Sequence, residues 1–128
     1  MLQKLVKPIA LLIVATVVVV LMANSNFNQQ VRAHSMVINQ TQIAEKLETL
    51  PDWKTDGETI HRMFKFQDFV AAIDFVNKLV EPAEKAGHHP DIAISYNKVT
   101  IELTTHDAGG ITQKDFDLAK TISELAEP

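Results

Sequence analysis

Hydrophobic and polar residues follow two different periods along residues 36–128, and the switches between the periods predict seven elements. Spacings of three and four residues, typical of an amphipathic helix, occur in three segments. Strict alternation, typical of a half-buried strand, occurs in two pairs of short segments. The predicted order is α-β-β-α-β-β-α, an α+β fold with a four-stranded antiparallel sheet and three helices on one face.

The first and last predicted helices carry capping signals at their N-termini. Asn39 followed by Gln42 resembles a capping box, and Pro51 stops the helix that begins there. Thr112 is the expected N-cap of the last helix, and Asp115 completes a second capping box. We therefore interpret Asp115 as a helix cap rather than as a catalyst.

The middle helix has the longest apolar pattern. Pro82 lies inside this pattern and removes one backbone hydrogen bond, so we expect a kink or a fresh start near Glu81. Gly87 is expected to end the helix, because glycine readily adopts the conformation of a C-terminal cap. The predicted inward face carries Phe66, Phe69, Val70, Ile73, Val76 and Val80.

Two hairpins complete the predicted sheet. The first joins residues 53–56 to residues 59–66. The second joins residues 91–96 to residues 99–105 through a two-residue turn at residues 97–98.

The turn at residues 97–98 fixes a predicted register for the second hairpin. It pairs apolar residues across the two strands, Ile94 with Ile101 and Ile92 with Leu103. A slip of one residue would destroy this apolar face. Extending the same ladder places His89 opposite His106.

The N-terminus differs from the rest of the chain. Two lysines precede an uncharged apolar run at residues 8–23. The run is typical of a signal peptide or a membrane anchor at residues 1–25, followed by a polar linker at residues 26–35. We expect membrane contact through this run and a domain, residues 36–128, on the non-cytoplasmic side. The alternative is a cytoplasmic protein whose true start lies further downstream.

Composition and charge narrow the range of functions. The chain of 128 residues suits one domain, and its lack of cysteine rules out disulfides, thiolate metal ligands and cysteine nucleophiles. From residue 36 onward it carries 9 basic and 16 acidic groups, a net charge of −7. No basic stripe is available to neutralise phosphates, so we expect no nucleic-acid partner.

Three of the five histidines, His88, His89 and His106, are the main candidates for catalysis. Pro90 favours extended backbone at His89, while His88 stays at the end of the middle helix. Imidazoles titrate near neutral pH, so such a group can supply an acid and a base at once. The alternative is a zinc site that includes Asp107, although adjacent strand residues point to opposite faces and chelate one ion poorly.

The residues around these histidines resemble the pterin-4a-carbinolamine dehydratase family over nearly all of the predicted domain. The resemblance lies in residues 84–90, 96–99 and 105–110 and in Asp115. An acidic residue stands four before the first His of a His-His-Pro run, a Tyr six after the Pro, a His ten after the Tyr and an Asp nine later. This combination is far more specific than His-His-Pro alone.

The resemblance implies a hydro-lyase that dehydrates a 4a-hydroxytetrahydropterin to the quinonoid dihydropterin, recycling the cofactor of aromatic amino-acid hydroxylases. It also implies that no metal or organic cofactor takes part, and that subunits associate as a homodimer or homotetramer. By position, catalysis falls to His88, His89 and His106. The implied substrate-binding residues are Glu84, His88, His89, Pro90, Thr105, His106, Asp107 and Ala108.

Three features depart from the family pattern. Ile92 stands where many members carry an aromatic residue, Pro82 interrupts the helix that members use for assembly, and the N-terminal run is unusual for cytosolic pterin recycling. Family members also act as non-enzymatic dimerisation or assembly factors. A binding module with the same fold is therefore the alternative to an enzyme, although such proteins tend to lose part of the histidine set.

Overall fold

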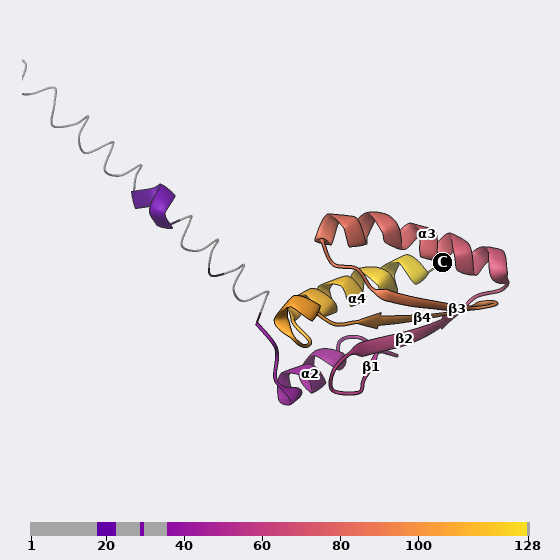
Figure 1. Cartoon of the computed structure of the whole chain (residues 1–128), viewed down its shortest axis with the longest axis horizontal. Helices are drawn as coiled ribbons and strands as arrows, with labels where there is room; N and C mark the ends of the chain where they lie inside the picture. The colour runs from indigo at the N-terminus through magenta and orange to yellow at the C-terminus, as the bar shows by residue number, and fades with distance from the viewer. Residues whose placement is uncertain (1–17, 23–28, 30–35, 128) are drawn as a thin grey trace, which may run out of the picture. The chain divides into compact units, whose positions relative to one another are not determined.

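The computed structural model describes residues 18–22, 29 and 36–127, and from residue 36 onward they form an α+β domain. Its helices α3 and α4 lie on the same face of the sheet (Figure 1). The predicted fold is confirmed, with a short 3₁₀ helix, η1, added to the predicted order. The elements are α2 (Gln40–Leu47), β1 (Lys54–Thr55), β2 (Ile60–Lys65), α3 (Phe69–Ala86), β3 (Asp91–Ser95), β4 (Lys98–Leu103), η1 (His106–Ala108) and α4 (Gln113–Ala126).

The described part of the chain contains no helix long and apolar enough to cross a membrane. This finding contradicts the predicted export or membrane anchoring, and with it the predicted membrane contact. The apolar run at residues 8–23 has 16 residues, whereas a spanning helix needs about 20. Apart from residues 18–22 and 29, the predicted leader and linker lie outside the described residues. The chain divides into two compact units, residues 1–33 and 34–128.

The sheet is antiparallel, with strand order β1-β2-β4-β3. In the central pair, Ile60 lies opposite Leu103 and Phe64 opposite Val99, and each of these side chains is at most 5% exposed. Met63, between them on β2, is 58% exposed on the other face. One face is therefore buried and the other open, as an antiparallel sheet allows. Burying each large apolar side chain contributes about 1.5–3 kcal/mol.

The buried face of the sheet, the helices and the chain entering β1 share one core. Each of α2, α3 and α4 contributes buried side chains to this core, so all three helices pack into a single hydrophobic cluster. Its buried members are Ile43, Leu50, Trp53, Ile60, Phe64, Ala72, Phe75, Leu79, Val99, Ile101, Leu103, Ile111, Phe116, Leu118, Ala119 and Ile122.

The register predicted for the second hairpin is wrong by two residues. Ile94 pairs with Val99, and Ile92 pairs with Ile101 rather than with Leu103. A two-residue slip leaves every side chain on its original face, since side chains alternate with a period of two. Apolar alternation therefore could not distinguish the two registers.

A contact with Phe66, the residue that follows β2, explains the observed turn. The turn is formed by Tyr96, whose φ is 56°, and Asn97, rather than by residues 97–98. The Asn97 side-chain amide donates to the Phe66 carbonyl oxygen at 2.7 Å, and the Phe66 N–H donates to the Asn97 carbonyl oxygen at 2.8 Å. Asn97 is thus held in the turn by the chain at the end of β2.

Helix α3 is continuous through Pro82, so the predicted fresh start near Glu81 is wrong. Proline removes a single backbone hydrogen bond. Leu79 and Ala83, on either side of it, are at most 5% exposed, and their packing outweighs that loss. Gly87 ends the helix with φ at 56°, as predicted.

The predicted inward face of α3 is also wrong. Its buried residues are Ala72, Phe75, Leu79 and Ala83. Of the predicted set, Phe66 and Val76 are partly buried against the core. The alanines carry a weak hydrophobic signal in the sequence, yet their small size lets the helix approach its neighbours closely. Three other members of the predicted set, Phe69, Val70 and Val80, are 50–65% exposed.

Both predicted capping boxes are confirmed. The Asn39 side chain accepts from the Gln42 N–H at 3.0 Å, and the Gln42 side chain accepts from the Asn39 N–H at 3.1 Å. At α4, Thr112 and Asp115 make the equivalent pair. In the turn between β1 and β2, hydrogen bonds to the Asp56 carboxylate from the Thr59 and Glu58 N–H groups hold the pKa of Asp56 below its usual value.

Candidate functional site

His88 lies where α3 ends, with its ring turned inward. After Gly87 the His88 N–H donates to the Ala83 carbonyl oxygen at 3.1 Å, which closes the helix end. The residue is 8% exposed. Its ring Nε2 lies 2.7 Å from Oδ1 of Asp115, a carboxylate with no exposed surface.

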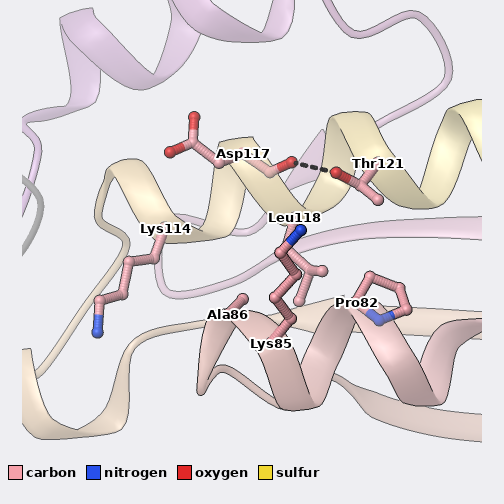
Figure 2. A pocket seen from close by; sticks show the side chains of 7 residues that line it. All are labelled: Pro82, Lys85, Ala86, Lys114, Asp117, Leu118 and Thr121. Atoms are coloured by element: carbon pink, nitrogen blue, oxygen red, sulfur yellow. Dashed lines mark hydrogen bonds between the residues drawn. The ribbon is translucent and has the colours of Figure 1, made fainter.

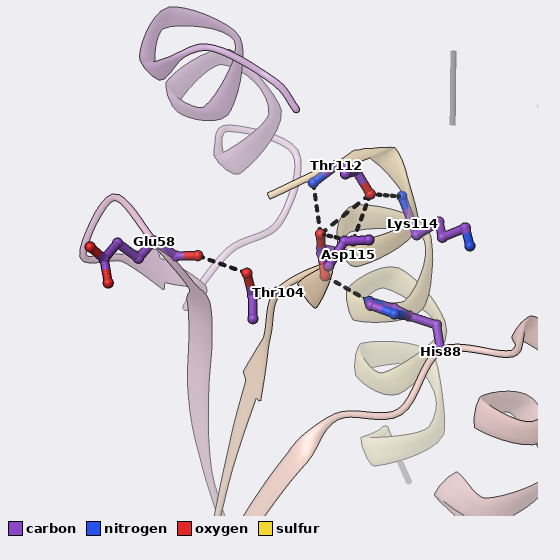
Figure 3. A network of polar contacts seen from close by, with 7 residues as sticks. Glu58, His88, Thr104, Thr112, Lys114 and Asp115 are labelled. Atoms are coloured by element: carbon purple, nitrogen blue, oxygen red, sulfur yellow. Dashed lines mark hydrogen bonds and ion pairs between the residues drawn. The ribbon is translucent and has the colours of Figure 1, made fainter. Parts of the chain in front are cut away.

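Asp115 is the centre of a buried polar network (Figure 3). Its Oδ2 accepts from the Thr112 N–H at 2.7 Å, which is the capping contact, and from the Thr105 hydroxyl at 2.8 Å. The two threonine hydroxyls lie 2.8 Å apart, and the Lys114 N–H donates to Oγ1 of Thr112 at 3.2 Å. One carboxylate therefore connects the start of α4, the end of β4 and the end of α3.

His106 follows Thr105 directly and is exposed at the start of η1. The Thr105 N–H donates to the Gly110 carbonyl oxygen at 3.1 Å, and the Ala108 N–H donates to the Thr105 carbonyl oxygen at 3.0 Å. Gly109 adopts φ of 74°, a conformation that favours glycine. This short closed loop fixes the backbone that carries His106.

His89 contrasts with its neighbour. Its Nε2 lies 2.9 Å from Oε1 of Glu84, and the two side chains are 63% and 70% exposed. Glu84, the acidic residue four before His88, is paired with His89. Two consecutive imidazoles thus have opposite settings, one buried against a carboxylate and one in contact with solvent.

The structure does not confirm the predicted cross-strand pair of His89 and His106. β3 begins at Asp91 and β4 ends at Leu103, so neither histidine belongs to the ladder. The segments that carry them are instead joined by the contacts of Asp115 with His88 and with Thr105. Of the other predicted substrate contacts, Pro90 and Ala108 are half-buried and Asp107 is exposed.

Sequence reasoning missed the second role of Asp115. The capping box uses only one of the two carboxylate oxygens, and the other is available for His88. The nine-residue spacing between His106 and Asp115, noted above as part of the motif, was the available signal. Local capping rules could not show that a residue 27 positions away supplies the partner.

A cavity of about 660 Å³ lies beside His106 and takes in neither His88 nor His89. A second cavity, of about 500 Å³, lies between α3 and α4 and includes Pro82, Lys85 and Lys114 (Figure 2). The first cavity is lined by Val37, Ile38, Asn39, Gln40, Ile43, Gly57, Glu58, Thr59, Thr104, His106, Gly109, Gly110 and Ile111. His106, a candidate catalytic group, is therefore part of the wall of this cavity.

Within the described residues, no group of three or more His, Asp or Glu side chains is arranged to hold a metal ion. Nε2 of His88 and Nε2 of His89 each contact a different carboxylate, Asp115 and Glu84 respectively. The arrangement suits proton transfer, because imidazoles beside carboxylates can hold and release protons.

Known proteins resemble this chain over the same residues. The family model described as "Pterin 4 alpha carbinolamine dehydratase" matches residues 36–125. The chain therefore belongs to the pterin 4 alpha carbinolamine dehydratase family.

Individual relatives agree with this assignment. A protein of Cyanothece sp. named "Putative pterin-4-alpha-carbinolamine dehydratase" is 65% identical over 92 residues, which cover 72% of this chain and 95% of the relative. A protein of Picosynechococcus sp. with the same name is 62% identical over 88 residues, covering 69% and 96%. The crystal structure of a transcriptional coactivator/pterin dehydratase from Brucella melitensis is 34% identical, with a TM-score of 0.68, covering 71% of this chain and 99% of that chain.

Proposed function

We propose that this chain catalyses the dehydration of a 4a-hydroxytetrahydropterin to the quinonoid dihydropterin, and so recycles a tetrahydropterin. The observation that supports the proposal most strongly is the bridge from His88 through Asp115 to Thr105. This bridge ties the segment that holds His88 and His89 to the segment that holds His106. The three imidazoles therefore lie on segments that hydrogen bonds connect, although they are separated in sequence.

The reaction needs two proton transfers. The bond between C4a and its hydroxyl oxygen breaks, and a protonated imidazole supplies the proton with which the hydroxyl leaves as water. A neutral imidazole takes the proton from N5, and the N5–H electrons form the new C4a=N5 double bond. The two imidazoles end with their protonation states exchanged and return to the start through solvent. Histidines in opposite states can perform both transfers near neutral pH.

The proposed substrate contacts surround these imidazoles. Glu84 and Pro90 flank the consecutive histidines, and residues 105–108 surround His106. The cavity of about 660 Å³ beside His106 is within the usual size range of small-molecule sites. No metal or organic cofactor takes part in the proposed steps, since only protons are transferred.

Alanine substitutions of the exposed histidines test the catalytic proposal. His89→Ala and His106→Ala should each lower the dehydration rate by about 10²–10⁴-fold, the usual contribution of an acid or base. If the two act on one substrate, the double variant should lose much less than the product of the single losses. Stopped-flow absorbance of the decaying 4a-hydroxytetrahydropterin measures the rates of the two single variants and of the double variant.

His61→Ala is the matched control, because it removes an imidazole that is not among the proposed catalytic residues. His61 is partly buried in β2, and its backbone neighbours across the sheet are Lys54 and Glu102. It should leave the rate within about 2-fold of wild type, well below the 10²-fold minimum expected for a lost acid or base. Full activity in both His89→Ala and His106→Ala would refute the proposed roles.

We also propose that the chain self-associates as a homodimer or homotetramer. Two exposed features support this: the side chains of Phe69, Val70 and Val80 on α3, and the edge strand β3, all of whose residues are exposed. Unpaired edge strands and exposed apolar faces both favour association. Sedimentation equilibrium should give a mass two or four times that of the chain, and Val70→Lys should lower it if α3 forms the contact.

The second candidate function is a binding or assembly role without catalysis. The name of the Brucella structure combines coactivator and dehydratase, so both roles are attached to that relative. The complete set of His88, His89 and His106 favours the enzyme for this chain. A folded, oligomeric protein that does not accelerate dehydration would favour the binding role.

A further inference from the structure

The hydrogen bonds around Asp115 determine which ring nitrogen of His88 carries a proton. An aspartate side chain is ordinarily a carboxylate at neutral pH and can only accept hydrogen bonds. The proton in the 2.7 Å contact between Nε2 and Oδ1 therefore belongs to His88. In the neutral ring Nδ1 is then the nitrogen with a lone pair, and it can accept a proton.

The remaining contacts of the network agree with this direction. Thr105 donates its one hydroxyl proton to Oδ2 of Asp115. Oγ1 of Thr105 must then accept in its 2.8 Å contact with Thr112, so the Thr112 hydroxyl donates there. Oγ1 of Thr112 accepts in turn from the Lys114 N–H. The Thr112 hydroxyl also lies 3.5 Å from Oδ2 of Asp115, a longer contact in which it is again the donor. The chain of donors therefore ends at the carboxylate.

Nδ1 of His88 is the nitrogen that reaches the surface. Among the described residues, every buried side-chain nitrogen and oxygen has a hydrogen-bond partner. Within that part of the chain Nδ1 makes no hydrogen bond, whereas Nε2 is held by Asp115. Nδ1 therefore belongs to the exposed 8% of His88.

We infer that Asp115 is a positioning residue that holds His88 in its Nε2–H tautomer, so that His88 meets the pterin through Nδ1 as a proton acceptor. Thr105 and Thr112 act through Asp115 by fixing the orientation of its carboxylate. The inference rests on the proposed dehydratase function for the identity of the substrate. The tautomer itself follows from the hydrogen bonds together with the acceptor-only character of a carboxylate.

Asp115→Asn changes the tautomer while keeping the shape of the side chain. The Thr112 N–H and the Thr105 hydroxyl both need an acceptor, so the amide oxygen of Asn takes the place of Oδ2. Its NH₂ group then faces Nε2, which must become the acceptor. His88 is thereby forced into the Nδ1–H tautomer and loses its lone pair at the surface.

Nitrogen-15 NMR of the histidine rings tests the tautomer directly in the full-length protein. At alkaline pH, where an ordinary imidazole is neutral, wild-type His88 should show a protonated Nε2 and an unprotonated Nδ1. Asp115→Asn should reverse the two signals. A wild-type Nδ1 that stays protonated, or a folded Asp115→Asn variant with an unchanged pattern, would overturn the inference.

The rate of pterin dehydration tests the role of Nδ1. Asp115→Asn should lower kcat by about 10²-fold, the lower end of a lost acid or base contribution, with a smaller change in KM. Asp117→Asn, a change of the same kind at an exposed position of α4, should leave the tautomer and kcat unchanged. A reversed tautomer with full kcat in Asp115→Asn would overturn the positioning role. A wild type with the predicted tautomer but without activity would instead refute the dehydratase function.

Discussion

His88 and His89 are adjacent in the chain yet lie in opposite environments. His88 is 8% exposed and bonds to a carboxylate with no exposed surface, whereas His89 and Glu84 form a pair in contact with solvent. A buried pair is costly to break, because each partner would be left without the water that normally solvates it. An exposed pair contributes little, since water replaces either partner. The same residue type therefore makes a buried contact at position 88 and a solvent-exposed one at position 89.

The largest effect expected from this comparison is the loss of the buried partner. Asp115→Ala should lower the free energy of unfolding by about 3–5 kcal/mol, because it leaves several buried hydrogen-bonding groups without their acceptor, at about 1–3 kcal/mol each. It removes the partner of His88 and the acceptor of Thr105 and Thr112. Urea denaturation followed by circular dichroism measures the difference. A loss of only about 1 kcal/mol would show that Asp115 acts as a helix cap alone.

Removing the charge from the exposed pair should have the smallest effect. Glu84→Gln should change the free energy of unfolding by less than about 0.5 kcal/mol, because an exposed ion pair is screened by solvent. The same urea titration applies, with wild type measured alongside. A loss comparable to that of Asp115→Ala would remove the contrast between the two histidines.

Elements set by local chemistry could be predicted from the sequence. The capping boxes at Asn39 and Thr112 and the helix end at Gly87 depend on residues within one turn of each other. The alternating pattern of β4 correctly placed Ile101 and Leu103 on the buried face. These features are short-range, so the sequence contains all the partners.

The errors arose where distant partners decide the outcome. The hairpin register depends on the contact of Asn97 with Phe66, which apolar alternation cannot reveal. The buried face of α3 was mistaken because the chain carries a second apolar stripe, and the alanines Ala72 and Ala83 gave the true one a weak signal.

The candidate site shows the same limit. The three histidines could be selected from the sequence, but the contact that connects their segments could not. Asp115 lies 27 residues from His88 and 10 residues from Thr105. Its capping role is local and was predicted correctly, whereas its contact with His88 exists only in the folded chain.

The most direct test of the dehydratase proposal is the decay of a 4a-hydroxytetrahydropterin, generated in place and followed by absorbance, with and without the purified protein. We predict that the folded wild-type chain accelerates the dehydration and that a metal chelator leaves the rate unchanged, because the proposed steps move only protons. No acceleration by a folded protein would contradict the proposal. So would an activity that disappears with chelator and returns with zinc.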